Sequence, residues 1–205
     1  VNAGVAKTLS AISGDTALKT LVITGSSDLV ISDHATDNTR LQTIDASAFT
    51  GNLTLSDTVS GAFGAQTITT GSGNDTIVFG ANLTSTDVVD MGGNTMTVFF
   101  TGGVDTLTAD VANRGTAAID YKYNVSNVEN LSLKLTTGAS VVDASGFTNV
   151  SSVNLWNADS AVVNMKLNNY DLATGLYLGR TASTGATSNQ ESNGTYTIVP
   201  TDATG

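Results

Sequence analysis

The chain has 205 residues, including 21 glycines, 1 proline and no cysteine, and its 18 acidic and 8 basic residues give a formal net charge of −10. Nucleic-acid binding needs a basic face, so this charge argues against a nucleic-acid partner. It is compatible with divalent cations. No apolar run approaches the roughly 20 residues of a membrane-spanning helix, so no transmembrane segment is expected.

The composition predicts an all-β chain. Thr, Ser, Asn, Asp and Gly fill much of the sequence, and all are unfavourable inside helices. Thr and Val favour strands, while Asn, Asp and Gly favour tight turns. We therefore expect short strands joined by tight turns.

Four similar segments succeed one another in the first half of the chain. They are residues 18–31, 41–55, 65–79 and, less closely, 86–99, and their starts lie 23, 24 and 21 residues apart. Spacing of this kind is the signature of a repeat architecture.

Two further similarities appear later. Residues 127–133 resemble residues 149–155, at a distance of 22, and the hexapeptide of residues 45–50 recurs as residues 143–148. In the hexapeptides, Asp45 and Asp143 are predicted to cap turns. Phe49 and Phe147 are predicted to fill the core.

A unit of 21–24 residues holds two or three short strands, which is one coil of a β-solenoid. We therefore predict a right-handed parallel β-helix, with a β-sandwich as the alternative. Apolar residues two apart are predicted to face the interior, where stacked coils bury them together. These pairs are Leu53 with Leu55, Leu131 with Leu133, and Val153 with Leu155.

Residues 1–166 are expected to form solenoid coils, and residues 167–205 less regular strands and a loop that close or continue them. Residues 182–194 are predicted to be a surface loop. Residues 196–199 are predicted to form a strand that Pro200 ends. We expect the chain to be a segment of a longer protein.

The stretch from Gly71 to Val78 reads Gly-Ser-Gly-Asn-Asp-Thr-Ile-Val, a glycine–aspartate motif suited to calcium. Glycines permit a sharp turn that points carbonyls at an ion, and aspartate supplies a hard anionic oxygen. The alternative is a tight turn in which Asp75 bonds its own backbone. The candidate calcium ligands are Gly71, Gly73, Asn74, Asp75 and Asp90, with Asp57 as an alternative neighbour to Asp90.

This motif resembles the nonapeptide repeat of the RTX proteins, and the segments 45–50 and 127–133 resemble parts of RTX-like bacterial S-layer proteins. The resemblance implies a calcium-binding β-solenoid, secreted by the type I route, that assembles at the cell surface. The chain departs from the family because residues 91–97 keep the glycines but have Thr95 where the repeat has aspartate.

Catalytic motifs are sparse. His34 is the only histidine, and its neighbours Ser32 and Asp33 suggest a triad only by proximity in sequence. A polysaccharide-active β-helix enzyme would need converging acidic and basic side chains, for which Asp110, Arg114 and Lys122 are the candidates. We expect no enzyme activity.

The expected function is therefore structural: a component of a bacterial surface layer, located outside the cell, that self-assembles with calcium. Other copies of the full-length protein are the expected partners, in a lattice or homo-oligomer, with cell-surface polysaccharide as a further possibility. The alternatives are an adhesin segment that binds a host ligand or glycan, and the polysaccharide-active enzyme.

Overall fold

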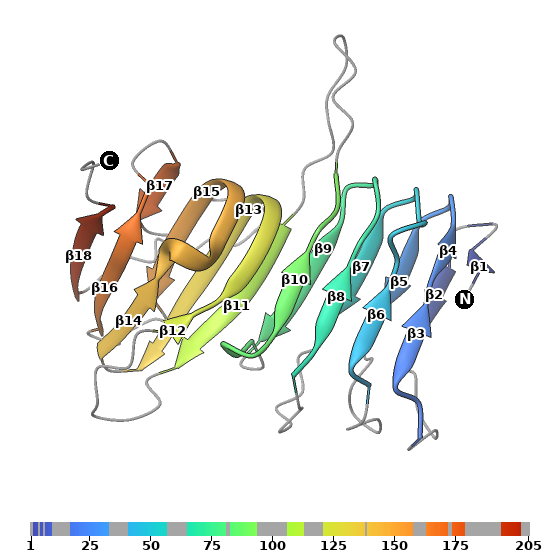
Figure 1. Cartoon of the computed structure of the whole chain (residues 1–205), viewed down its shortest axis with the longest axis horizontal. Coiled ribbons are helices and arrows are strands. Elements are labelled where there is room, and N and C mark those ends of the chain that lie inside the picture. Colours follow the sequence, from blue (N-terminus) through green and yellow to red (C-terminus); the bar gives the residue numbers. More distant parts are fainter. Residues whose placement is uncertain are drawn as a thin grey trace, which may run out of the picture.

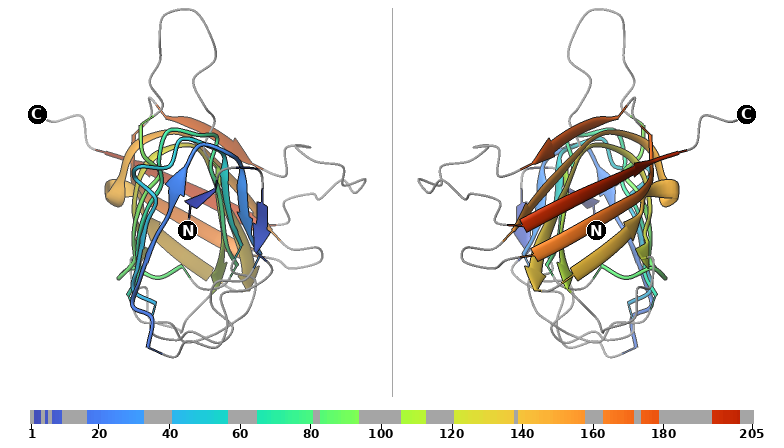
Figure 2. Two further views of the ribbon diagram at one scale, coloured as in Figure 1. Left: turned by 90° about the vertical axis from the view of Figure 1, so that its right-hand side faces the viewer. Right: turned by 90° about the vertical axis from the view of Figure 1, so that its left-hand side faces the viewer.

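The computed structural model describes residues 2–3, 5, 7–9, 17–32, 41–56, 65–80, 83–93, 106–112, 121–137, 139–157, 163–171, 174–178 and 194–201. Its strands stack along one long axis, from the N-terminal end to the C-terminal end (Figure 1). Viewed along that axis, they enclose a common interior (Figure 2). The predicted all-β solenoid is confirmed.

The strands of the first half are short. They are β1 (Asn2–Ala3), β2 (Lys7–Leu9), β3 (Thr20–Val22), β4 (Thr24–Gly25), β5 (Leu29–Ile31), β6 (Thr43–Asp45), β7 (Leu53–Ser56), β8 (Thr67–Thr69), β9 (Thr76–Gly80) and β10 (Val88–Asp90).

Several strands of the second half are longer. They are β11 (Thr106–Ala112), β12 (Tyr121–Lys122), β13 (Asn124–Thr137), β14 (Ala139–Asp143), β15 (Phe147–Asn157), β16 (Val163–Tyr170), β17 (Gly175–Leu178) and β18 (Gly194–Pro200). A 3-10 turn, η1 (Ala144–Gly146), joins β14 to β15, and the described ranges contain no α-helix.

Every strand pairing in the described residues is parallel, as coil-on-coil stacking requires. The first face has the order β2-β5-β7-β9-β11-β13-β15-β17, and the second face has the order β3-β6-β8-β10-β13-β15. A third sheet, β12-β14-β16-β18, covers the C-terminal half. These continuous parallel ladders exclude the alternative of an ordinary sandwich.

The predicted repeat spacing matches the pairing register. Leu21 pairs with Ile44, 23 positions on, Ile44 with Ile68 after 24, and Ile68 with Val89 after 21. Leu131 pairs with Val153, 22 positions later. The coil length increases between these two regions, where Val89 pairs with Val125, 36 positions on.

Two inner rows of apolar side chains run along the solenoid. The first inner row consists of Leu9, Ile31, Leu55, Ile77, Leu107, Leu131, Val153 and Leu176. The second inner row consists of Leu21, Ile44, Ile68, Val89, Val125 and Phe147. From Ile31 to Val153, every member of the first row is at most 1% exposed.

The predicted interior pairs are confirmed, because Leu53, Leu133 and Leu155, like their partners, have no exposed surface. Phe49 is also fully buried. Phe147 is only partly buried and packs against the edge of the core. The two hexapeptides therefore differ in how deeply their aromatic rings enter the interior.

Asparagines in a left-handed backbone conformation make the corners of the longer strands. Asn127, Asn149 and Asn169 have φ values of 57°, 55° and 53°. Asparagine tolerates this conformation better than most residues because its short polar side chain bonds locally. The bend at Asn127 lets the start of β13 pair with β10 and its remainder with β11.

The C-terminal strands continue the ladders, since β17 pairs with β15 and β18 pairs with β16. The strand predicted at residues 196–199 lies within β18, whose last residue is Pro200. Of the loop predicted at 182–194, residues 182–193 lie outside the described residues.

Removing a side chain from an inner row is expected to destabilise the whole stack. Ile77 is 1% exposed, so Ile77→Ala is expected to lower the free energy of unfolding by about 2–5 kcal/mol through lost burial and a cavity. Urea denaturation measures this loss. Val88→Ala is the control: Val88 is 45% exposed, so a change within about 0.5 kcal/mol is expected. Equal losses in the two variants would contradict the assignment of Ile77 to the core.

Candidate functional site

The Gly71–Asp75 segment forms the corner between β8 and β9. In the preceding coil, the corner between Phe49 and Asn52 lies directly against it. The Ser72 N–H donates to the Phe49 carbonyl at 3.1 Å, and the Asn74 N–H donates to the Asn52 Oδ1 at 2.8 Å. The motif therefore sits at a contact between two coils.

Close backbone contact between coils requires the glycines of this corner. A Cβ atom on Gly71 would lie 1.7 Å from the Phe49 carbonyl oxygen, and one on Gly73 would lie 2.1 Å from the Gly51 oxygen. Gly92 of the following coil has a φ of +81°, and a Cβ there would lie 2.1 Å from the Gly71 oxygen. Stacked coils thus account for the glycine spacing without any ion.

Asp75 is completely buried beside the preceding coil. Thr76 pairs with Thr54, which places Asp75 level with Leu53, and the Leu53 N–H donates to the Asp75 Oδ1 at 2.9 Å. Burial raises the pKa of Asp75, although hydrogen bonds from Leu53, Thr70 and Gly71 act in the opposite direction. The carboxylate thus accepts from the preceding coil, at the Leu53 N–H, and also from its own turn, at the Gly71 N–H. The second bond is the kind that the tight-turn alternative predicts.

Asn74 belongs to a column of polar side chains on successive coils. The Asn52 N–H donates to the Asp28 Oδ1 at 3.1 Å, just as the Asn74 N–H donates to Asn52. Each side-chain oxygen accepts the backbone N–H of the next coil at a corner. These bonds satisfy backbone donors where the regular ladder is interrupted.

Asp90 takes part in a second polar column, which points toward the following coils. Its Oδ1 accepts from the Gly92 N–H at 3.0 Å and from the Asn127 Nδ2 at 2.7 Å. The Asn149 Nδ2 then donates to the Asn127 Oδ1 at 2.9 Å. Asp75 bonds the preceding coil and Asp90 the following one, so the two predicted ligands have separate sets of partners.

The described residues contain no group of three or more His, Cys, Asp or Glu side chains that could hold a metal ion. A calcium ion at Asp75 or Asp90 would therefore need backbone carbonyl or water oxygens to reach its usual 6–8 ligands. Calcium binding at Gly71, Gly73, Asn74, Asp75 and Asp90 stays a prediction.

The turn-capping roles of Asp45 and Asp143 are confirmed. The Asp45 Oδ1 accepts from the Ser47 N–H at 3.1 Å and from the Ser47 hydroxyl at 2.7 Å, and these bonds lower the pKa of Asp45. The Asp143 Oδ1 accepts from the Ser145 N–H at 2.9 Å. A hydrogen bond from Asn169, at 2.9 Å, is the largest cause of the lowered pKa of Asp143.

Of the three candidates for a polysaccharide-active enzyme, the structure describes Asp110 and Lys122. Asp110 lies on β11 of the first face, whereas Lys122 lies on β12 of the third sheet, in register with Asp143. Two different sheets thus carry these residues. The other catalytic candidates, His34 and Arg114, lie outside the described residues, as do the alternative calcium ligand Asp57 and Thr95 of the degenerate repeat.

Sequence reasoning did not find the two polar columns, although the signal was present. Asn127 and Asn149 begin the two similar segments that lie 22 residues apart, and Asp28, Asn52 and Asn74 recur at intervals of 24 and 22. A polar residue recurring at the coil length immediately beside an apolar row indicates such a column.

Comparison with known proteins found no matching family model, no similar curated protein and no similar solved structure. Among the described residues, no helix has the length and apolar character needed to cross a membrane.

Gly71→Ala is expected to destabilise the protein, because its methyl group would overlap the Phe49 carbonyl. The expected loss is about 1–3 kcal/mol or more, measured by urea denaturation in the presence of a chelator. Gly93→Ala is the matched control, since no atom lies within 4 Å of a Cβ at Gly93. If both variants were equally stable, the steric account of the motif would be wrong.

The buried Asp75 is expected to make stability fall as pH rises. Its pKa is raised in the folded state, so its contribution to stability is complete below the ordinary pKa of about 4 and is lost as pH rises through the folded value. In chelator, the unfolding free energy of wild type minus that of Asp75→Asn is expected to decrease between pH 3 and pH 7.

Asp143→Asn supplies the control with the opposite sign. The pKa of Asp143 is lowered, so its contribution is present above the ordinary pKa and is lost as pH falls. The corresponding difference for Asp143→Asn is expected to increase over the same pH range. Two differences that change in the same direction would contradict this assignment.

Proposed function

We propose that this chain is a structural segment of a bacterial cell-surface layer, and that it self-assembles with calcium outside the cell. The observation that carries the proposal is the continuous parallel stack, in which the first inner row extends from β2 to β17. Such a stack gives a stiff, extended body whose outward side chains repeat at the coil spacing of about 4.8 Å. Regular spacing suits repeated contacts between copies.

The charge of the chain supports a role for divalent cations. At a net charge of −10, copies repel one another, and this repulsion opposes close packing. Exposed carboxylates such as Asp28 and Asp171 lie on the surface, where calcium would reduce that repulsion. Calcium between copies and calcium at the Gly71–Asp75 corner are two separate possibilities, and the following experiment distinguishes them.

Calcium is expected to promote reversible association of the purified chain. Dynamic light scattering with millimolar calcium should report larger particles than scattering in chelator, and magnesium at equal ionic strength serves as the control. Identical size distributions in calcium and chelator would contradict the proposal.

Thermal unfolding of Asp75→Asn locates the ion. If calcium binds at the corner, it stabilises the folded wild type by mass action and raises its melting temperature more than that of Asp75→Asn. Asp143→Asn, which also loses one carboxylate, should respond like wild type. An equal rise in all three proteins would place the effective calcium away from Asp75.

A further inference from the structure

The outward side of the first face carries two rows of short side chains, one on either side of the first inner row. Side chains alternate along a strand, so the residues just before and just after an inner-row residue point outward. The first outer row consists of Thr8, Val30, Thr54, Thr76, Asn130 and Ser152, and the second outer row of Ser56, Val78, Ser132 and Asn154. On β11, the positions in these rows are those of Thr106 and Thr108.

Both outer rows keep their register through the middle of the stack. Thr54 pairs with Thr76 and Ser56 with Val78, and described strands continue the first face on both sides of them. Neighbouring strands lie about 4.8 Å apart, and residues two apart along a strand lie about 6.7 Å apart. The outer rows therefore form a regular two-dimensional array, and its centre lies well inside the described stack.

The side chains at the centre of the array are short and stiff. Thr54, Ser56, Thr76 and Val78 are all half-buried between their neighbours. Threonine and valine have few side-chain rotamers because they branch at Cβ. The array is therefore preorganised, and little conformational entropy is lost when it meets a second ordered surface.

The outer rows hold no charged residue, although the chain has 18 acidic and 8 basic residues. The second face has the same short strands and the same spacing, yet Asp45 and Asp90 lie at its outward positions. Strand propensity accounts for the threonines of both faces, but it does not account for this difference in charge. The first face is therefore suited to a neutral partner.

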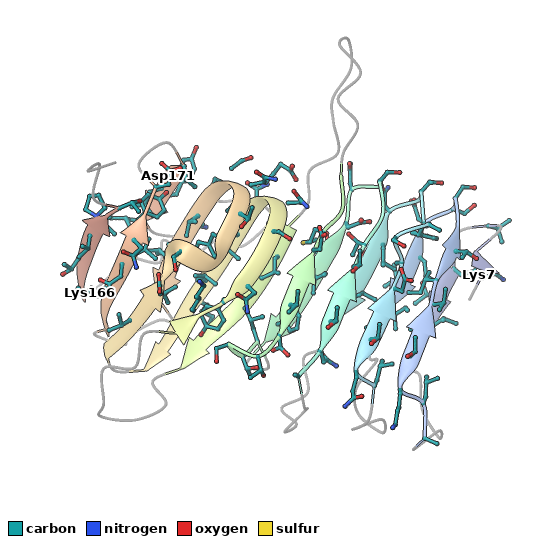
Figure 3. The ribbon with its side chains drawn as sticks, in the orientation of Figure 1. Lys7, Lys166 and Asp171 are labelled. Atoms are coloured by element: carbon teal, nitrogen blue, oxygen red, sulfur yellow. The ribbon has the colours of Figure 1, made fainter. Side chains whose placement is uncertain are left out.

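Charges border the array but do not enter it. Asp28 lies at the adjoining corner, where its Oδ1 accepts from the Asn52 N–H at 3.1 Å. Lys7 lies at the N-terminal end of the stack, and Lys166 and Asp171 lie at its C-terminal end, far from the middle coils (Figure 3).

The size and chemistry of the array limit what can bind it. Its seven strands, from β2 to β15, and its two rows cover about 30 by 10 Å, or about 300 Å². A stable protein partner covers about 800 Å² on each side. Up to β15 the rows lack an aromatic ring on which a sugar can stack, and at β17 the array ends with Gly175 and Tyr177. A neutral ligand with a repeating surface fits better than either.

Ice has such a surface. It is neutral, and its oxygen atoms repeat at close to the strand spacing along one lattice direction and at close to the row spacing along the perpendicular direction. Hydroxyl groups of the outer rows can hydrogen-bond to lattice water, while methyl groups order the water above them. A charged group would keep its own hydration shell instead. We propose that the outer rows of the first face are an ice-binding surface, a function that goes beyond assembly.

An ice recrystallisation assay tests this inference, and chelator is present so that calcium-dependent assembly does not contribute. Wild type is expected to keep ice crystals small. Thr54→Tyr puts a bulky ring at the centre of the array and should lower this activity about tenfold or more, as the loss of a central contact does. Thr54→Val keeps the branching at Cβ and the shape, so it should retain most of the activity.

Thr67→Tyr is the matched control. Thr67 is exposed at an outward position of β8 on the second face, so the same substitution there should leave the activity like that of wild type. Circular dichroism and urea midpoints establish that each variant is folded. If Thr54→Tyr does not fold, Val78→Tyr makes the equivalent change in the second outer row.

Three results would overturn the inference: a wild type that leaves ice growth unchanged, equal activity of Thr54→Tyr and Thr67→Tyr, or retention on insoluble cellulose without an effect on ice. Inhibition of ice growth by a chain that calcium does not assemble would support the ice-binding surface and contradict the proposed function. Calcium-dependent assembly of a chain without effect on ice would do the reverse.

Discussion

Burial of apolar side chains between successive coils is the interaction on which this structure depends. A strand of three residues, such as β6 or β8, has no stability alone, and its single inward side chain gains burial only from the coils on either side. Ile44 and Ile68 are buried because each covers the other in the second inner row. Stability therefore belongs to the stack and not to any single coil.

The corners face a different constraint, because the backbone turns there and the regular ladder is interrupted. Glycines let one corner approach the next, while Asp and Asn side chains accept the backbone N–H groups of neighbouring coils. Asp75 is the extreme case, because its side chain is fully buried where it accepts from the Leu53 N–H. Burial disfavours the charged form of this carboxyl, which is why the pKa of Asp75 is raised. A cation close to the carboxylate would offset that cost, which gives the calcium prediction a physical motive independent of the motif.

The repeat and its interior residues were predictable from sequence because both follow from one periodicity. Apolar positions two apart recur at 21–24 residues, and the register of Leu21, Ile44, Ile68 and Val89 has these spacings. The third sheet was not predicted, because it arises only after the coil lengthens between Val89 and Val125 and the spacing changes. The two polar columns were not predicted either, because their hydrogen bonds join different coils and are not contained in a single motif.

The hexapeptides show why local similarity alone does not fix position in the stack. Both begin with an aspartate that accepts from the N–H two residues later, and both continue with a buried alanine. However, Asp45 is the last residue of β6 on the second face, whereas Asp143 is the last residue of β14 in the third sheet, so the two segments turn away from different sheets. A turn of this sequence is therefore a reusable corner, and the coil around it decides how far its phenylalanine enters the core.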